Sequence, residues 1–483
     1  MFLRKSALYS VGSNAFQFGV QFIASVIVAR LLMPDEMGVF TIAIAAYGLL
    51  FAFQNIGLVQ YVTNHDDMSP RRLGGAMAMS AAQGVLLALV LILVAWGLSV
   101  FMEDPRIFNA VAILALVALL LPTEHIPMGL LQREMRFDHI AIVLIARTLA
   151  NTSVTVAGAY FGLSYASMAW GALAGSLVGG VIGVVLCAQK MRVRPNTQHW
   201  REIGGFGLSM LSFTSITNIA SRSSVVVLGK VADITSVGHF GRATGITDMV
   251  QFGLIEPLGR LVLPSLANAR RADGGMGDMY RRAASVLTIV SWPAFAGLAV
   301  LSHPLIAFIY GERWLPAAPA LIWLCIARIF VEMATCPVEV SVASNQMPRL
   351  TRLAIVKSGI GFAAFSIGAS FGLVWAAFGR TVEALAGAVL YLPFMLRATE
   401  LKWGALLSVW RTSAIATAAA IGPAFFWMAS KGWPDTLPIL EMAGVIVLGV
   451  ICWIAALAAV RHEIWVQICR GSQFLLTKAR ARG

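Results

Sequence analysis

Polar and basic side chains recur at helical spacing inside otherwise apolar segments of this sequence. Asn14, Gln17 and Gln21 share one face of the first such segment, and Asn218 and Arg222 share a face of a later one. A charge inside a membrane usually faces a water-filled cavity, and arginine binds phosphate through two parallel hydrogen bonds. We therefore predict a cationic cavity for a phosphate-bearing substrate. Its predicted lining comprises Asn14, Gln17, Gln21, Arg30, Arg147, Asn218, Arg222, Arg242 and Arg328.

Some of these charges have a structural alternative. Asp248 either pairs with Arg222, which has no acidic neighbour on its own helix, or serves in cation coupling. Two pairs have the spacing of intrahelical ion pairs, namely Arg328 with Glu332 and Arg380 with Glu383. For the second pair we expect a structural role.

Glycine recurs every fourth residue at Gly171, Gly175, Gly179 and Gly183. Such positions allow two helices to approach backbone to backbone. We predict tight helix packing here rather than a ligand site.

Signatures of enzymatic chemistry are missing from the sequence. It contains no G-x-x-x-x-G-K-[S/T] nucleotide loop and no H-E-x-x-H zinc motif. The five cysteines form no C-x-x-C pair, so neither a disulfide framework nor a metal site is expected. We predict no catalytic residue, no metal and no cofactor.

The elements that must position these residues are membrane helices. The chain is 58% hydrophobic and only 12% charged, against about 25% charged in soluble domains. Apolar stretches of about twenty residues follow one another, each long enough to cross the hydrocarbon core. Because they lack the alternation of barrel strands, we predict an all-α integral membrane protein with about fourteen transmembrane helices. The predicted spans are residues 10–32, 37–63, 73–101, 107–131, 138–162, 165–189, 204–229, 235–263, 282–302, 316–345, 351–371, 373–396, 409–429 and 437–460.

The basic residues indicate the orientation. Of the 36 Lys and Arg residues, about 25 fall in alternate connecting segments on one side and about five on the other. The basic side is the cytoplasmic one, so both termini are expected in the cytoplasm. The net charge of +13 then reflects topology and anionic lipid headgroups, and we expect no nucleic-acid partner.

The sequence contains an internal repeat. Residues 26–40 align without a gap to 226–240, with Gly38 opposite Gly238 and Phe40 opposite Phe240. The repeat predicts two parallel six-helix halves with a substrate path between them, as in alternating-access transporters. The expected divisions are residues 1–189 for the N-terminal half, 190–203 for a cytoplasmic linker, 204–396 for the C-terminal half, and 397–483 for two terminal helices with a basic cytoplasmic tail.

Several motifs carry a resemblance to a known family. Ala29–Phe40, Asn55–Leu58, Gln132–Phe137 and Tyr310–Pro319 follow one another in the order and spacing typical of one group of membrane proteins. In these features the chain resembles the Wzx-type polysaccharide flippases of the multidrug/oligosaccharidyl-lipid/polysaccharide exporter superfamily. The resemblance spans the first twelve helices, and the last two match in hydropathy and position alone.

This resemblance implies a flippase for undecaprenyl-pyrophosphate-linked oligosaccharide units, moving them from the cytoplasmic to the periplasmic leaflet of a bacterial inner membrane. The product would serve exopolysaccharide, capsule or lipopolysaccharide synthesis. Other polysaccharide-assembly membrane proteins are then potential partners beside the lipids. Some members of this family couple transport to a proton or sodium gradient. The candidates for that role are Asp248, Glu256, Glu332 and Glu339.

Two alternatives stay open. A drug/cation antiporter of the same superfamily would usually stop at twelve helices and rely on acidic residues. A polytopic membrane glycosyltransferase or polymerase would place its acceptor site in a large outer loop, and no such loop is present.

Overall fold

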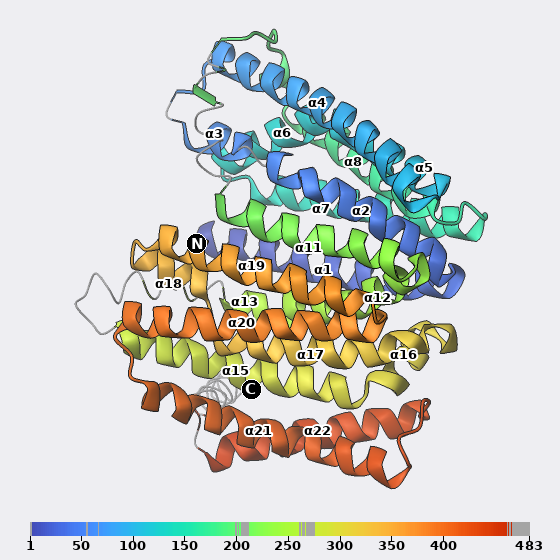
Figure 1. Ribbon diagram of the computed structural model, residues 1–483. Coiled ribbons are helices and arrows are strands. Elements are labelled where there is room, and N and C mark those ends of the chain that lie inside the picture. Colours follow the sequence, from blue (N-terminus) through green and yellow to red (C-terminus); the bar gives the residue numbers. More distant parts are fainter. Residues whose placement is uncertain are drawn as a thin grey trace, which may run out of the picture. The chain divides into compact units, whose positions relative to one another are not determined.

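The computed structural model describes residues 2–54, 57–65, 67–198, 200, 202–203, 212–259, 262, 266, 276–460, 462 and 465. At positions 2–11, 13–15, 51–54 and 212–217 it describes the backbone alone. Helices make up nearly all of this described part (Figure 1), which confirms the predicted all-α class.

The chain divides into two compact units, Met1–Gly241 and Arg242–Gly483. The first contains α1 (Phe2–Leu31), α2 (Pro34–Gln54), α3 (Leu58–Asn64), α4 (Pro70–Met102), α5 (Pro105–Leu119), α6 (Leu121–Arg133), α7 (Phe137–Tyr160), α8 (Ala166–Leu186), α9 (Ala188–Met191), α11 (Ser212–Val231) and the start of α12 (Ile234–Val250). The second continues from α12 through the π-helix η1 (Gln251–Ile255), α13 (Glu256–Gly259), α15 (Met276–Val300), α16 (Ser302–Tyr310), the 3₁₀ helix η2 (Glu312–Ala317), α17 (Ala318–Met333), α18 (Pro337–Ala343), α19 (Met347–Ala369), α20 (Leu373–Thr399), α21 (Trp403–Ser430) and α22 (Ile439–Ala459).

The boundary between these units lies inside α12 and not in the predicted linker. The reason is that α11 packs along α2, so the first helices after the linker belong to the first unit. The two predicted six-helix halves therefore stay a prediction.

Local sequence explains where several helices begin. Proline, which needs no N–H partner in a first turn, opens α2, α4, α5 and α18. The Asp104 carboxylate caps α5 by accepting a hydrogen bond of 2.9 Å from the backbone N–H of Arg106. Local sequence thus favours the observed starts of α2 at Pro34 and α5 at Pro105.

The described helices agree with the predicted spans in order and position, while residues 55–56, 204–211, 260–261 and 263 of those spans lie outside the described residues. Among the described residues, nine helices are long and apolar enough to cross a membrane, or ten when α5 and α6, bent by 45° at Leu120, count as one span. Two of the predicted spans are irregular. Residues 235–263 contain the π-helical turn η1, and residues 316–345 are divided into α17 and α18.

The two copies of the repeat contact each other through their glycines. A Cβ at Gly38 would collide with the carbonyl oxygen of Ile234, and a Cβ at Gly238 would collide with that of Pro34. These contacts are equivalent, because the offset between the repeats relates Gly38 to Gly238 and Pro34 to Ile234. Glycine is required at both positions for such an approach. The reciprocity supports the internal repeat.

The glycine stripe of α8 packs against its neighbours as predicted, and α7 and α8 run side by side (Figure 1). A Cβ at Gly171 would overlap the Thr155 hydroxyl, and one at Gly175 would lie 2.9 Å from the Arg147 carbonyl oxygen. Gly183 faces the ring of Pro127 on α6. The glycine stripe therefore has a structural function, the close packing of α8 on α6 and α7.

Candidate functional site

In the first unit, Arg222 lies half-buried on α11 against α2. Its guanidinium crosses the backbone of Gly48, where a Cβ would lie only 2.8 Å from Nε. Within the described part of the chain, no hydrogen bond or ion pair to Arg222 is present. The guanidinium donors of Arg222 are therefore unoccupied among the described residues.

Arg147 of α7 forms an ion pair with a carboxylate of α6. Its Nη1 lies 3.0 Å from Oε2 of Glu124, and its Nη2 lies 3.4 Å from Oγ of Ser176. The Glu124 side chain is 16% exposed and that of Arg147 is 43% exposed. An internal carboxylate therefore holds one side of the guanidinium, while the other side stays accessible.

The polar stripe of α1 is only partly described. Gln17 accepts a 3.4 Å hydrogen bond from the Thr148 hydroxyl of α7, whereas Gln21 is exposed. Arg30 is exposed in the last turn of α1. The side chain of Asn14 lies outside the described residues, and Asn218 is half-buried on α11.

In the second unit, Arg242 stacks on two aromatic rings of the Tyr310–Pro319 motif. The guanidinium carbon lies 5.7 Å from the ring centre of Tyr310 and 5.9 Å from that of Trp314. Both rings are almost fully buried. Cation–π contacts of this kind stabilise a desolvated arginine. The motif therefore explains how α12 accommodates a charge at this position.

Arg328 does not pair with Glu332, the neighbour on its own helix. It forms an ion pair with Asp248 of α12, which corrects the suggested pairing of Arg328 with Glu332. The physical reason is that packing of α12 brings a carboxylate from another helix closer than the intrahelical spacing does. Glu332 instead accepts a 3.4 Å hydrogen bond from Nε2 of Gln251.

The predicted pair Arg380–Glu383 is confirmed, with Nη1 and Oε2 2.7 Å apart. The sequence did not reveal its third member, Lys357, whose Nζ lies 3.5 Å from Oε1 of Glu383. Lys357 lies in the middle of α19. Gly361 makes room for the carboxylate, because a Cβ there would overlap Glu383. This charge cluster serves packing between α19 and α20.

The remaining acidic candidates lie near these contacts. Glu256 begins α13 directly after the π-helix, and Glu339 lies in the first turn of α18. Both are half-buried. Asp248, Glu332 and these two residues thus all belong to the irregular spans of the second unit.

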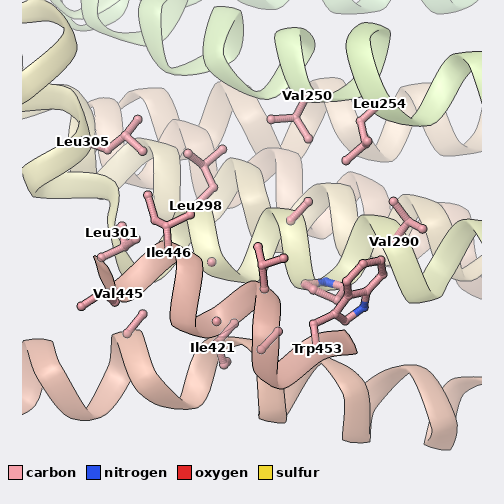
Figure 2. Close-up of a pocket in the computed structure, with 17 residues that line it drawn as sticks. Val250, Leu254, Val290, Leu298, Leu301, Leu305, Ile421, Val445, Ile446 and Trp453 are labelled. Carbon is pink, nitrogen blue, oxygen red and sulfur yellow. The ribbon is translucent and has the colours of Figure 1, made fainter. Parts of the chain in front are cut away.

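An apolar cavity of about 400 Å³ lies in the second unit (Figure 2). Val250 and Leu254 close one side, Leu298 of α15 another, and Ile421 and Trp453 line it from α21 and α22. Trp453 directs its indole N–H away, donating to the carbonyl oxygen of Ile289 at 3.0 Å. The lining is otherwise aliphatic, so the cavity suits a hydrocarbon chain rather than a polar ligand.

Comparisons with known proteins add a family and a fold. A family model described as "Polysaccharide biosynthesis protein" matches residues 27–319. The lipopolysaccharide biosynthesis protein WzxC of Escherichia coli (strain K12) is 20% identical over 336 residues, which are 67% of this chain and 66% of that protein. The chain thus spans about two thirds of the length of this curated relative.

Two solved structures share the fold. The lipid II flippase MurJ, in an inward closed conformation, superposes with a TM-score of 0.75 at 13% identity, covering 95% of this chain and 99% of that one. An inward-facing multidrug resistance transporter of the MATE family gives a TM-score of 0.67 at 13% identity, covering 80% of this chain and 95% of that one. The superposition on MurJ covers 95% of this chain, and this share is large enough that it must include the terminal helices α21 and α22.

Proposed function

Because the chain belongs to the polysaccharide biosynthesis protein family, we propose that it flips lipid-linked oligosaccharides across the bacterial inner membrane. The unit would be carried on undecaprenyl pyrophosphate and move from the cytoplasmic to the periplasmic leaflet. Family membership confirms the resemblance based on Ala29–Phe40 and the later motifs. The two solved folds belong to a flippase and a transporter, which agrees with a transport protein rather than an enzyme.

The observation that carries this proposal is the apolar cavity walled by α21 and α22. A lipid-linked substrate needs an apolar surface for its hydrocarbon and cationic donors for its diphosphate. The cavity supplies a surface of the first kind, and Arg222, with no anionic partner among the described residues, supplies a donor of the second kind. A cationic drug would be repelled by such a donor.

We further propose that the two repeat-related halves rock against each other to alternate access. The proposed orientation, with both termini in the cytoplasm, is supported by the distribution of basic residues between alternate connecting segments. Arg30, Arg147, Arg242 and Arg328 remain candidates for contacts with the diphosphate or sugars, in addition to Arg222.

Deletion of the gene followed by analysis of lipid-linked intermediates tests the proposed function. A complete repeat unit accumulating on the cytoplasmic face is the expected result. An incomplete unit would indicate a glycosyltransferase or polymerase, and normal polysaccharide with increased drug sensitivity would indicate an exporter.

The residue-level test uses Arg222→Gln and Arg242→Gln in the complemented deletion strain. Loss of a charge-assisted hydrogen bond, roughly 1.5–3 kcal/mol, corresponds to a decrease in transport of about ten- to a hundredfold. Arg411→Gln, an equivalent change at an exposed position of α21, is the control and should transport normally. Full transport by both Arg222→Gln and Arg242→Gln would refute their assignment, provided that the protein level in the membrane is unchanged.

A further inference from the structure

Two irregular helices meet at one buried carboxylate, Glu332. The π-helical turn Gln251–Ile255 interrupts the span that begins with α12. Opposite it, α17 ends at Met333 and α18 begins at Pro337, with Cys336 in the left-handed region at φ 53°. Such π-turns and broken membrane helices concentrate at functional sites. A strained, interrupted backbone at this point needs a reason beyond packing.

Glu332 is only 7% exposed, and its bond from Gln251 Nε2 is the single side-chain hydrogen bond that the described residues provide to it. The other end of the Gln251 amide, Oε1, is buried and has no hydrogen-bond partner among the described residues. The nearest cation, Arg328, is held by Asp248. A buried acid thus faces an amide with one unused acceptor.

This arrangement suits both protonation states of the acid. As a carboxylate, Glu332 accepts a hydrogen bond from the Gln251 amino group, as observed. As a neutral acid, Glu332 gains an O–H donor. A half-turn of the amide then presents the unused Oε1 of Gln251 as its acceptor. Neither state leaves Glu332 without a partner.

Among the described residues, the other charged or titratable groups around Glu332 are Arg328 on its own helix, Glu339 of α18, Cys336 in the break and Tyr280 of α15. Tyr280 directs its hydroxyl to Met395, so it leaves the acid unbonded. The contrast is Glu383, which Arg380 and Lys357 hold between two cations. Such a carboxylate has no reason to accept a proton.

We propose that Glu332 is the proton carrier of the transport cycle and that Gln251 is its positioning residue. This assignment rests on the proposed transport function. One proton from water on one side of the membrane forms an O–H bond on Glu332, the amide of Gln251 turns, and the proton returns to water on the other side. A metal cation fits less well, because hard cations need about six oxygen ligands. Among the described residues, no three acidic, His or Cys side chains gather to hold one.

Carbodiimide labelling of the purified protein tests the proton site without any substrate. Dicyclohexylcarbodiimide reacts with protonated carboxyl groups in apolar surroundings, and peptide mass spectrometry locates the adduct. We expect an adduct on Glu332 that decreases as the pH rises, and none on Glu383 in the same molecule. No adduct on Glu332 at any pH, or equal labelling of both residues, would overturn the proposal.

Transport in proteoliposomes with an imposed pH gradient tests the coupling. The probe is undecaprenyl pyrophosphate carrying one sugar, and the readout is its exposure to an external enzyme. The wild-type rate should rise about tenfold with the gradient, whereas Glu332→Gln should lose that response. Glu441→Gln, which removes the carboxylate of a solvent-accessible ion pair with Lys431, should keep it. A full gradient response in Glu332→Gln would contradict the assignment.

Two further outcomes are distinguishable. If Glu332→Gln yields little folded protein, Gln251→Leu replaces it in the test. This variant keeps the Glu332 carboxyl group but removes both amide partners. It should reduce the gradient response of transport and change the pH dependence of carbodiimide labelling. If the wild-type protein moves no probe, the proposed function fails, and the labelling result alone decides whether Glu332 exchanges a proton.

Discussion

Removal of the Glu383 carboxylate should destabilise the second unit strongly. Glu383→Gln leaves Arg380 and Lys357 without their common anion, although all three side chains are mostly buried, at 16%, 16% and 22% exposure. Breaking a buried ion pair from one side costs about 3–5 kcal/mol. At roughly 2–4 °C per kcal/mol for a unit of this size, we expect the Tm to fall by about 6–20 °C.

The effect should be graded along the cluster. Arg380→Gln leaves Glu383 with Lys357 at 3.5 Å, so its cost should be lower, about 1–3 kcal/mol. The control is Glu441→Gln, whose partner Lys431 is 46% exposed, and for which a loss of 0 to about 1 kcal/mol is expected. The assay is the fraction of detergent-solubilised protein that stays monodisperse after heating. A Tm for Glu383→Gln no lower than that of the control would refute the reasoning.

Two further predictions concern Gly238 and Glu134 of the first unit. Gly238→Val should lower the free energy of unfolding by about 1–3 kcal/mol, because the valine side chain meets the Pro34 carbonyl oxygen. The control is Gly245→Val on the same helix, where a Cβ meets no atom within 4 Å, and it should leave the Tm nearly unchanged. Equal losses in the two variants would disprove the close contact. The hydrogen bond from Lys190 holds the pKa of Glu134 below its ordinary value of 4.5. A lowered pKa means that this stabilisation is present above pH 4.5 and is lost as the pH falls through the folded-state pKa. The Tm of Glu134→Gln should therefore depend less on pH between 6 and about 3 than that of the wild-type protein, and identical pH profiles would contradict this.

The sequence by itself determined the features that depend on neighbours along the chain. Apolar stretches of membrane-spanning length predicted helices in their correct order. Helical spacing predicted the pair Arg380–Glu383, and the four-residue glycine period predicted the close packing of α8. These inferences succeed because the geometry of a helix fixes which residues three or four positions apart share a face.

The tertiary structure alone decided which charges meet across helices. Arg328 binds Asp248 instead of Glu332, Arg147 binds Glu124, and Lys357 joins a cluster inside the second unit. Such partners depend on how each helix is rotated and how far it is shifted along its neighbour. Close backbone contacts at glycines and local irregularities such as the π-turn at Gln251 set that register. Neither the glycine contacts nor the π-turn can be calculated from spacing within a single helix. The contact of Glu332 with Gln251, whose Oε1 is an unused acceptor, therefore became visible only in the folded chain.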